Sequence, residues 1–310
     1  MGGIVELDEK DILKRLVKNE QLFRKIHVVT QRYDILPNDK DHMGAFIDYQ
    51  DISELRDDFV EELSDTIVDW IYSSEKFTEL KNKLINKGKS ESAATREIGR
   101  LTQEKFRANR NDEDLLIQGQ LGELLLFQFI QRYMKAVPLL RKMPITTSAG
   151  HERFGADAIH YKIENGKHII ILGEAKTYTS KYKFNKAFEE ALGSILNSYN
   201  NLRKELRLYV HEDFLDDELN VVAEEYLNNT LKPVEVHLVS LITYDETHKL
   251  TISNEKDIKE QIKKVIEEKY KNFENSKIDL NKNPILNRIT YIVFPVWDLE
   301  DLAKRFQKLI

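Results

Sequence analysis

An Asn-Gly dipeptide between two apolar runs constrains this chain more than any other feature of its sequence. Asn165-Gly166 separates an alternating run, residues 156–163, from an apolar run, residues 168–172. Asn-Gly tolerates the positive φ that both central residues of a type I′ turn require, so the two runs are predicted to be the strands of one tight hairpin. A two-residue loop also fixes the register of the hairpin.

The predicted register brings two acidic residues together. If Glu164 pairs with Lys167, counting back along both strands places Asp157 opposite Glu174. Like charges that face each other directly destabilise a sheet unless something offsets their repulsion. A divalent cation would do so, because two carboxylates suit a hard ion such as Mg²⁺ or Mn²⁺.

Lys176 is expected on the same patch as these acids. Side chains of a strand alternate between its two faces, so Glu174 and Lys176 share one face while Ala175 points to the other. A lysine beside two acids can orient an attacking water or stabilise charge on a phosphoryl group. The hairpin alone leaves an alternative open, a salt bridge at a strand end in which Lys176 neutralises one acid.

Composition excludes several classes of protein. The 310 residues include no cysteine, so a disulfide framework, a zinc–thiolate site and a cysteine nucleophile are impossible. The start of the chain is charged, and no run approaches the roughly 20 apolar residues that a membrane helix needs. We therefore expect no signal peptide, no membrane association and a cytoplasmic location. A Ser-His-Asp hydrolase is not expected either, because there is no G-x-S-x-G segment.

Charge is unevenly distributed along the chain. The net charge of −6 argues against a protein that coats nucleic acid nonspecifically. Acidic residues concentrate on a predicted amphipathic helix, residues 51–72, which is interpreted as a solvated face, a cover for basic residues or a docking surface for a partner protein. The basic residues that follow the hairpin are Lys176, Lys181, Lys183 and Lys186.

A further acid lies within a predicted apolar helix, residues 114–135. The middle of this helix contains Gly119, Gly122 and Glu123. An internal glycine costs about 1 kcal/mol relative to alanine, so the two glycines indicate a close backbone approach. Glu123 shares the apolar stripe, where a buried carboxylate needs a partner or a metal ion. The alternative is a capped or partly exposed glutamate that bonds to a nearby arginine.

The order of predicted elements indicates an α/β protein. From residue 114 it reads helix, three strands, helix and strand, with a further strand at 289–296. This αβββαβ order, a mixed sheet flanked by helices, resembles the PD-(D/E)XK restriction-endonuclease-like nuclease fold. Residues 1–92 are predicted to form a mainly helical accessory region, and residues 93–310 the nuclease-like domain.

The resemblance extends to individual residues. Asp157 matches the first acid of the PD-(D/E)XK motif, and Ala156 replaces its proline. Glu174-Ala175-Lys176 matches the E-x-K part, and Glu123 matches an acid that many members carry on the first helix. Together, the segments GxLGE (119–123), GADxxH (155–160) and GEAK (173–176) resemble the HamA family of the bacterial Hachiman anti-phage defence system.

This resemblance implies a metal-dependent DNA nuclease that a HamB-like partner helicase controls. In this interpretation Asp157, Glu174, the Ala175 carbonyl and Glu123 hold Mg²⁺ or Mn²⁺. Lys176 then positions the water and stabilises the transition state.

Two other functions stay open at the level of sequence. One is a catalytically silent DNA-binding or scaffold module of the same fold, and the other is an RNA nuclease, since a metal site of this kind acts on the phosphodiester and not on the base. His160 lies on the strand face opposite to Asp157 and is interpreted as structural. His151 and Glu152, in the loop before the hairpin, are candidate substrate contacts.

Overall fold

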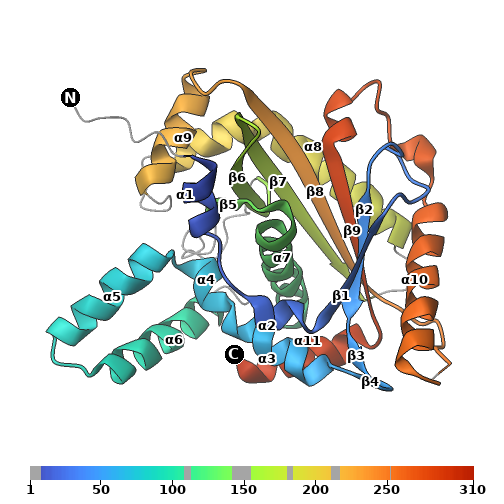
Figure 1. Ribbon diagram of the computed structural model, residues 1–310, viewed down its shortest axis with the longest axis horizontal. Helices are drawn as coiled ribbons and strands as arrows, with labels where there is room; N and C mark the ends of the chain where they lie inside the picture. Colours follow the sequence, from blue (N-terminus) through green and yellow to red (C-terminus); the bar gives the residue numbers. More distant parts are fainter. Residues whose placement is uncertain (1–7, 108–112, 142–154, 180–183, 211–216, 252) are drawn as a thin grey trace.

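A seven-stranded mixed sheet forms the centre of the molecule in the computed structural model (Figure 1). The structure describes residues 8–107, 113–141, 155–179, 184–210, 217–251 and 253–310. The strand order in the sheet is β1-β2-β9-β8-β7-β6-β5, and β3 and β4 form a separate two-stranded sheet. The strands are β1 Ile26–Gln31, β2 His42–Ile47, β3 Tyr49–Gln50, β4 Ser53–Glu54, β5 Val137–Leu140, β6 Ala158–Glu164, β7 Lys167–Tyr178, β8 Val234–Asp245 and β9 Ile289–Val296.

Helices lie on both sides of this sheet, as Figure 1 shows for α7 and α8. The α-helices are α1 Glu9–Lys14, α2 Glu20–Phe23, α3 Arg56–Asp65, α4 Ile67–Ile71, α5 Ser74–Asn86, α6 Glu91–Arg107, α7 Glu113–Met134, α8 Phe184–Tyr209, α9 Asp217–Leu227, α10 Glu255–Lys271 and α11 Leu299–Leu309. Two 3₁₀ helices, η2 Asn275–Lys277 and η3 Pro284–Arg288, precede β9.

The directions of the strands explain why the sheet is mixed. β5, β6 and β7 pair in antiparallel fashion, whereas β8 runs parallel to β7 and β9 runs parallel to β8. From α7 onward the order is α7, β5, β6, β7, α8 and β8, with the unpredicted α9 inserted before β8. The prediction of an α/β protein with a mixed sheet flanked by helices is confirmed.

The two faces of β7 belong to two hydrophobic cores. Ile170 and Leu172 pack into the core that α8 and α10 cover, whereas Ile169 and Ile171 pack into the core that α3, α7 and α11 cover. This alternation follows from the period of a strand. It also places Glu174 and Lys176 on the α8 face, and Ala175 on the α7 face.

The N-terminal region contributes strands as well as helices. β2 runs parallel to β9 through Met43↔Ile292, and β1 extends the sheet beyond it. The predicted mainly helical region therefore also builds one edge of the sheet. The division at residue 92 stays a prediction; α5 and α6, on its two sides, pack together and project from the body (Figure 1).

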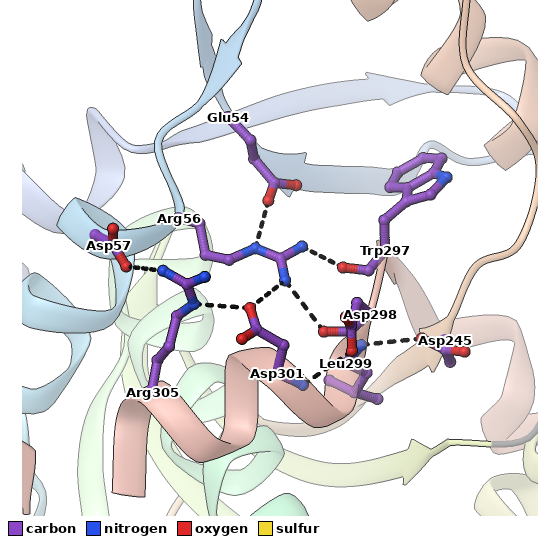
Figure 2. Close-up of polar contacts among 9 residues, drawn as sticks. All are labelled: Glu54, Arg56, Asp57, Asp245, Trp297, Asp298, Leu299, Asp301 and Arg305. Atoms are coloured by element: carbon purple, nitrogen blue, oxygen red, sulfur yellow. Dashed lines mark hydrogen bonds and ion pairs between the residues drawn. The ribbon is translucent and has the colours of Figure 1, made fainter. Parts of the chain in front are cut away.

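The acidic segment 51–72 was predicted as one helix, and this prediction is wrong. The structure contains α3 and α4 with Thr66 between them, whose hydroxyl donates to the Leu63 carbonyl at 2.7 Å. α3 packs against α11, and Arg56 of α3 reaches the acids and carbonyls at the start of α11 (Figure 2). Of the acids of α3, Asp57 pairs with Arg305 of α11, and Asp58 pairs with Lys25.

Candidate functional site

The hairpin that organises the site has the predicted register. Asn165 and Gly166 both have positive φ, 52° and 73°. The ladder of β6 and β7 runs from Glu164↔Lys167 to Ala158↔Gly173. Asp157 follows immediately beyond its last pair, so β6 delivers this acid to the strand that carries Glu174.

Asp157 is held by the backbone of β7. Its Oδ2 accepts a hydrogen bond from the Ala175 N–H at 2.9 Å. The side chain is half-buried. This bond fixes the carboxylate beside the E-x-K segment.

Glu174 is the buried acid of the site. Only 2% of the residue is exposed, and its Oε1 lies 2.8 Å from the Lys176 Nζ. Among the described residues its Oε2 has no hydrogen-bond partner. Burial and, second, the charge of Asp157 together raise the pKa of Glu174 to about 7, against the opposing effects of Lys176 and the Ser194 side chain.

Lys176 lies between carboxylates of two elements. Burial lowers its pKa, but the charges of Glu174, Asp157 and Glu190 outweigh this effect and the net pKa is raised. Glu190 belongs to α8, and it accepts a hydrogen bond from the Tyr178 hydroxyl at the end of β7. Alternation along β7 extends to Tyr178, so the sequence contained the signal for Tyr178 but none for Glu190.

A carboxylate of α8 fixes the backbone in front of Asp157. Glu205 is 4% exposed, and its Oε2 accepts a hydrogen bond from the Ala156 N–H at 3.3 Å. Gly155 has a φ of 115°, and a Cβ added there would lie 2.1 Å from the same oxygen. Only glycine fits this position without displacing Glu205. Sequence reasoning missed Glu205; its place beside Leu206 in an apolar helix was the available signal.

Glu123 belongs to α7, which packs on the other face of the sheet. Gly122, its neighbour on α7, packs so closely on Thr177 that an added Cβ would lie 2.4 Å from the threonine Oγ1. The predicted close approach is thus confirmed at Gly122, whereas at Gly119 an added Cβ would meet no atom of the described residues within 4 Å. Thr177 lies on the face opposite to Glu174.

The structure therefore brings Asp157, Glu174 and Lys176 together. Within the described ranges, no three His, Cys, Asp or Glu side chains form a group that could hold a metal ion. The part assigned to Glu123 stays a prediction.

His160 has the environment of a structural residue. It is fully buried, and its ring packs edge-on against Phe127 with centroids 5.2 Å apart. Burial lowers its pKa to about 3, so the ring is neutral. The candidate substrate contacts His151 and Glu152, together with Lys181 and Lys183, lie outside the described residues.

The donor set fits a hard divalent cation. Asp157 and Glu174 offer carboxylate oxygens, which Mg²⁺ and Mn²⁺ prefer over nitrogen or sulfur. The unpartnered Oε2 of Glu174 and the raised pKa of this residue indicate an excess of negative charge in a buried place. A cation would remove that excess.

Comparisons with known proteins add a family. A family model described as HamA matches residues 22–310, nearly the whole chain. A search among curated proteins found no match. No helix in the described part of the chain combines the length and the apolar character needed to cross a membrane.

Proposed function

The chain belongs to the HamA family and is thereby related to the Hachiman antiviral defence system, and from this premise we propose that it is a metal-dependent DNA nuclease under the control of a partner helicase. One observation carries the proposal. A buried glutamate whose pKa is raised to about 7 lies beside a second acid and a lysine, at the end of a hairpin. Perturbed pKa values of this kind concentrate at functional sites.

Each residue has a role in this proposal. Asp157 and Glu174 would hold Mg²⁺ or Mn²⁺, aided by the Ala175 carbonyl and, from α7, by Glu123. A cation bound there supplies Lewis-acid stabilisation of phosphoryl oxygens and a bound water of lowered pKa. Lys176 donates hydrogen bonds to the phosphate oxygens as negative charge develops on them. Its ion pair with Glu174, at 2.8 Å, holds the ammonium group in place for this role.

A second candidate function is a catalytically silent DNA-binding or scaffold module. The 2.8 Å ion pair between Lys176 and Glu174 favours it, because a lysine that neutralises one acid is a sufficient structural role. The surplus of one carboxylate over the lysine favours the nuclease. The proposed site of action is the cytoplasm, on DNA, with RNA as the competing substrate.

Cleavage assays distinguish these functions. The purified chain, alone and with its helicase partner, is incubated with plasmid DNA or structured RNA in Mg²⁺ or in EDTA. We expect Mg²⁺-dependent cleavage of DNA, and a loss on the order of 10²-fold or more in Glu174→Ala and Lys176→Ala. The matched control is Glu164→Ala on the same hairpin, whose exposed carboxylate pairs with Lys162 at 2.9 Å. Cleavage by Glu174→Ala at the wild-type rate overturns the nuclease assignment, and binding without any cleavage favours the silent module.

A further inference from the structure

A pocket adjoins the site on the side of Asp157. It encloses about 290 Å³. Among the described residues, Gly155, two residues before Asp157, forms one wall, and the other lining residues belong to α8. The lining residues on α8 are Asn197, Asn201, Lys204, Glu205 and Leu208.

The same helix connects the pocket to the acids. The side chain of Ser194, on α8, lowers the pKa of the Glu174 carboxyl group. With a rise of about 1.5 Å per residue, Asn197 and Asn201 lie about 4.5 Å and about 10.5 Å farther along the helix axis. A stacked nucleic-acid strand advances about 3.4 Å per nucleotide. The pocket is therefore within reach of the nucleotides that adjoin a phosphate held at Glu174.

Two side-chain amides form a hydrogen-bonding edge at the pocket. Asn201 Nδ2 donates to the Asn197 main-chain carbonyl at 2.9 Å and to its Oδ1 at 3.1 Å, so the two amides orient each other. Each amide has two N–H donors and one acceptor oxygen, and these contacts use only part of that capacity. Leu208, which is 61% exposed, adds an apolar wall.

This combination matches a nucleobase. A base presents donors and acceptors along its edge and an apolar face, and enzymes that accommodate an unstacked base contact both. A phosphate or a free cation would use the amide edge but not Leu208. A lipid chain would use Leu208 but not the amides.

A cation and a fixed wall complete the pocket. Lys204 is exposed, and it forms no ion pair with any described residue. Its charge is thus available to a phosphate group. Glu205 is buried and bonded to the Ala156 N–H, so the wall toward Asp157 is in place before a ligand arrives.

We propose that this pocket binds one nucleobase of the nucleic-acid substrate next to the scissile phosphate, with Lys204 on the adjoining phosphate. The inference rests on the proposed function and specifies how the substrate lies. A base enters the pocket only when it is unstacked, so single-stranded or frayed DNA binds more tightly than an intact duplex.

Binding measurements test this proposal without relying on cleavage. Fluorescein-labelled single-stranded DNA and the matched duplex are titrated with the full chain in EDTA, and affinity is followed by fluorescence anisotropy at several salt concentrations. We expect the double variant Asn197→Ala/Asn201→Ala to bind the single strand about tenfold more weakly and to lose its preference over the duplex. Lys204→Ala should weaken both complexes. It should also make the plot of log affinity against log salt less steep, reducing the magnitude of its slope by about one.

The matched control is Arg207→Ala, which removes an exposed, positively charged side chain from the same helix outside the pocket. It should leave the preference for single strands unchanged. Wild-type single-strand affinity and preference in the double asparagine variant overturn the pocket and leave the proposed nuclease intact. Binding that depends on the asparagines, in a protein that never cleaves, supports the pocket and overturns the nuclease. No binding of either DNA by the wild-type chain overturns the pocket.

Discussion

Two clusters of charged side chains in this molecule are arranged in different ways. The Arg56 cluster, defined as Glu54, Arg56, Asp57, Asp301 and Arg305, pairs every guanidinium with acids (Figure 2). The Asp157 cluster, defined as Asp157, Glu174 and Lys176, contains two acids and one lysine.

The Arg56 cluster has matched donors and acceptors. Arg56 Nε donates to Glu54 at 2.6 Å, and its Nη1 donates to Asp301 at 3.0 Å. Nη1 also donates to the Asp298 carbonyl at 3.1 Å, and Nη2 donates to the Trp297 carbonyl (Figure 2). This cluster joins the N-terminal region to the end of β9 and to α11, so its role is to hold the fold together.

The buried acid of the Asp157 cluster is less completely bonded. The Oε2 of Glu174 has no hydrogen-bond partner among the described residues, and the pKa of this acid is raised to about 7. Asp301, in contrast, has its pKa lowered by its hydrogen bond to Arg305. Burial of charge alone therefore does not distinguish a functional site from a structural one. The distinguishing property is the buried Oε2 of Glu174, a carboxylate oxygen that lacks a hydrogen-bond partner among the described residues.

Removal of Arg56 should have the largest effect on stability. Arg56→Ala leaves Glu54 and Asp301 without their shared partner, and we expect a loss of about 3 kcal/mol in the free energy of unfolding, as for other buried pairs that lose one member. Urea denaturation measures it. Lys76→Ala breaks an exposed pair and should cost less than about 1 kcal/mol. Equal losses of stability in the two variants would mean that the Arg56 cluster does not hold the N-terminal region against α11.

Gly155→Ala should show how firmly α8 holds the turn before Asp157. The new methyl group must adopt a positive φ and displace the Glu205 carboxylate, so we expect a loss of about 2 kcal/mol together with weaker metal binding. Gly166→Ala is the matched control, since it also has a positive φ but an added Cβ would have no neighbour within 4 Å. It should cost about 1 kcal/mol and leave metal binding unchanged. The reverse order of the two losses would contradict the contact with Glu205.

Glu174→Gln should stabilise the metal-free protein, because it removes an unbalanced charge. Since folding raises the pKa of Glu174 from 4.5 to about 7, stability is greatest below 4.5 and falls as pH rises through 7. We expect a gain of about 1 to 3 kcal/mol at pH 8 in EDTA and no gain at pH 4. Asp301→Asn in the matched cluster should instead be destabilising at pH 8. Urea denaturation at the two pH values checks both signs; a loss at pH 8 in Glu174→Gln would refute the imbalance.

Asp157→Asn should have the smallest effect. It relieves repulsion with Glu174 and keeps an oxygen that can accept a hydrogen bond from the Ala175 N–H. The free energy of unfolding in EDTA should therefore increase by less than about 1 kcal/mol, which appears as a slightly higher melting temperature. Thermal denaturation in EDTA measures this change. An unchanged or lower melting temperature would show that the two acids do not repel each other in the folded protein.

The sequence predicted the part of the site that depends on local rules. A two-residue turn and the period of a strand were sufficient to place Glu174 and Lys176 on one face and Asp157 beside them. The partners on α8 could not be predicted this way. Glu190 and Glu205 reach the site only through the packing of a helix across β7, and no local pattern gives that geometry.

The fold shows the same limit. β2 pairs with β1 and with the distant β9, and it was not predicted because its sequence, HMGAFI, contains a glycine. Gly44 is required there, since an added Cβ would lie 2.8 Å from both the Ile266 side chain and the Tyr33 hydroxyl. A residue that weakens a strand in isolation is thus demanded by a contact with α10.

Isothermal titration of the metal-free chain with Mn²⁺ and Mg²⁺ tests most directly whether the excess charge at Asp157 and Glu174 serves a cation. We expect the wild-type chain to bind either ion with release of protons near pH 7, because the pKa of Glu174 is about 7. Glu174→Gln should abolish this binding, and Lys76→Ala should leave it unchanged. Absence of binding in the wild-type chain, or equal binding in Glu174→Gln, would contradict a metal site at this hairpin.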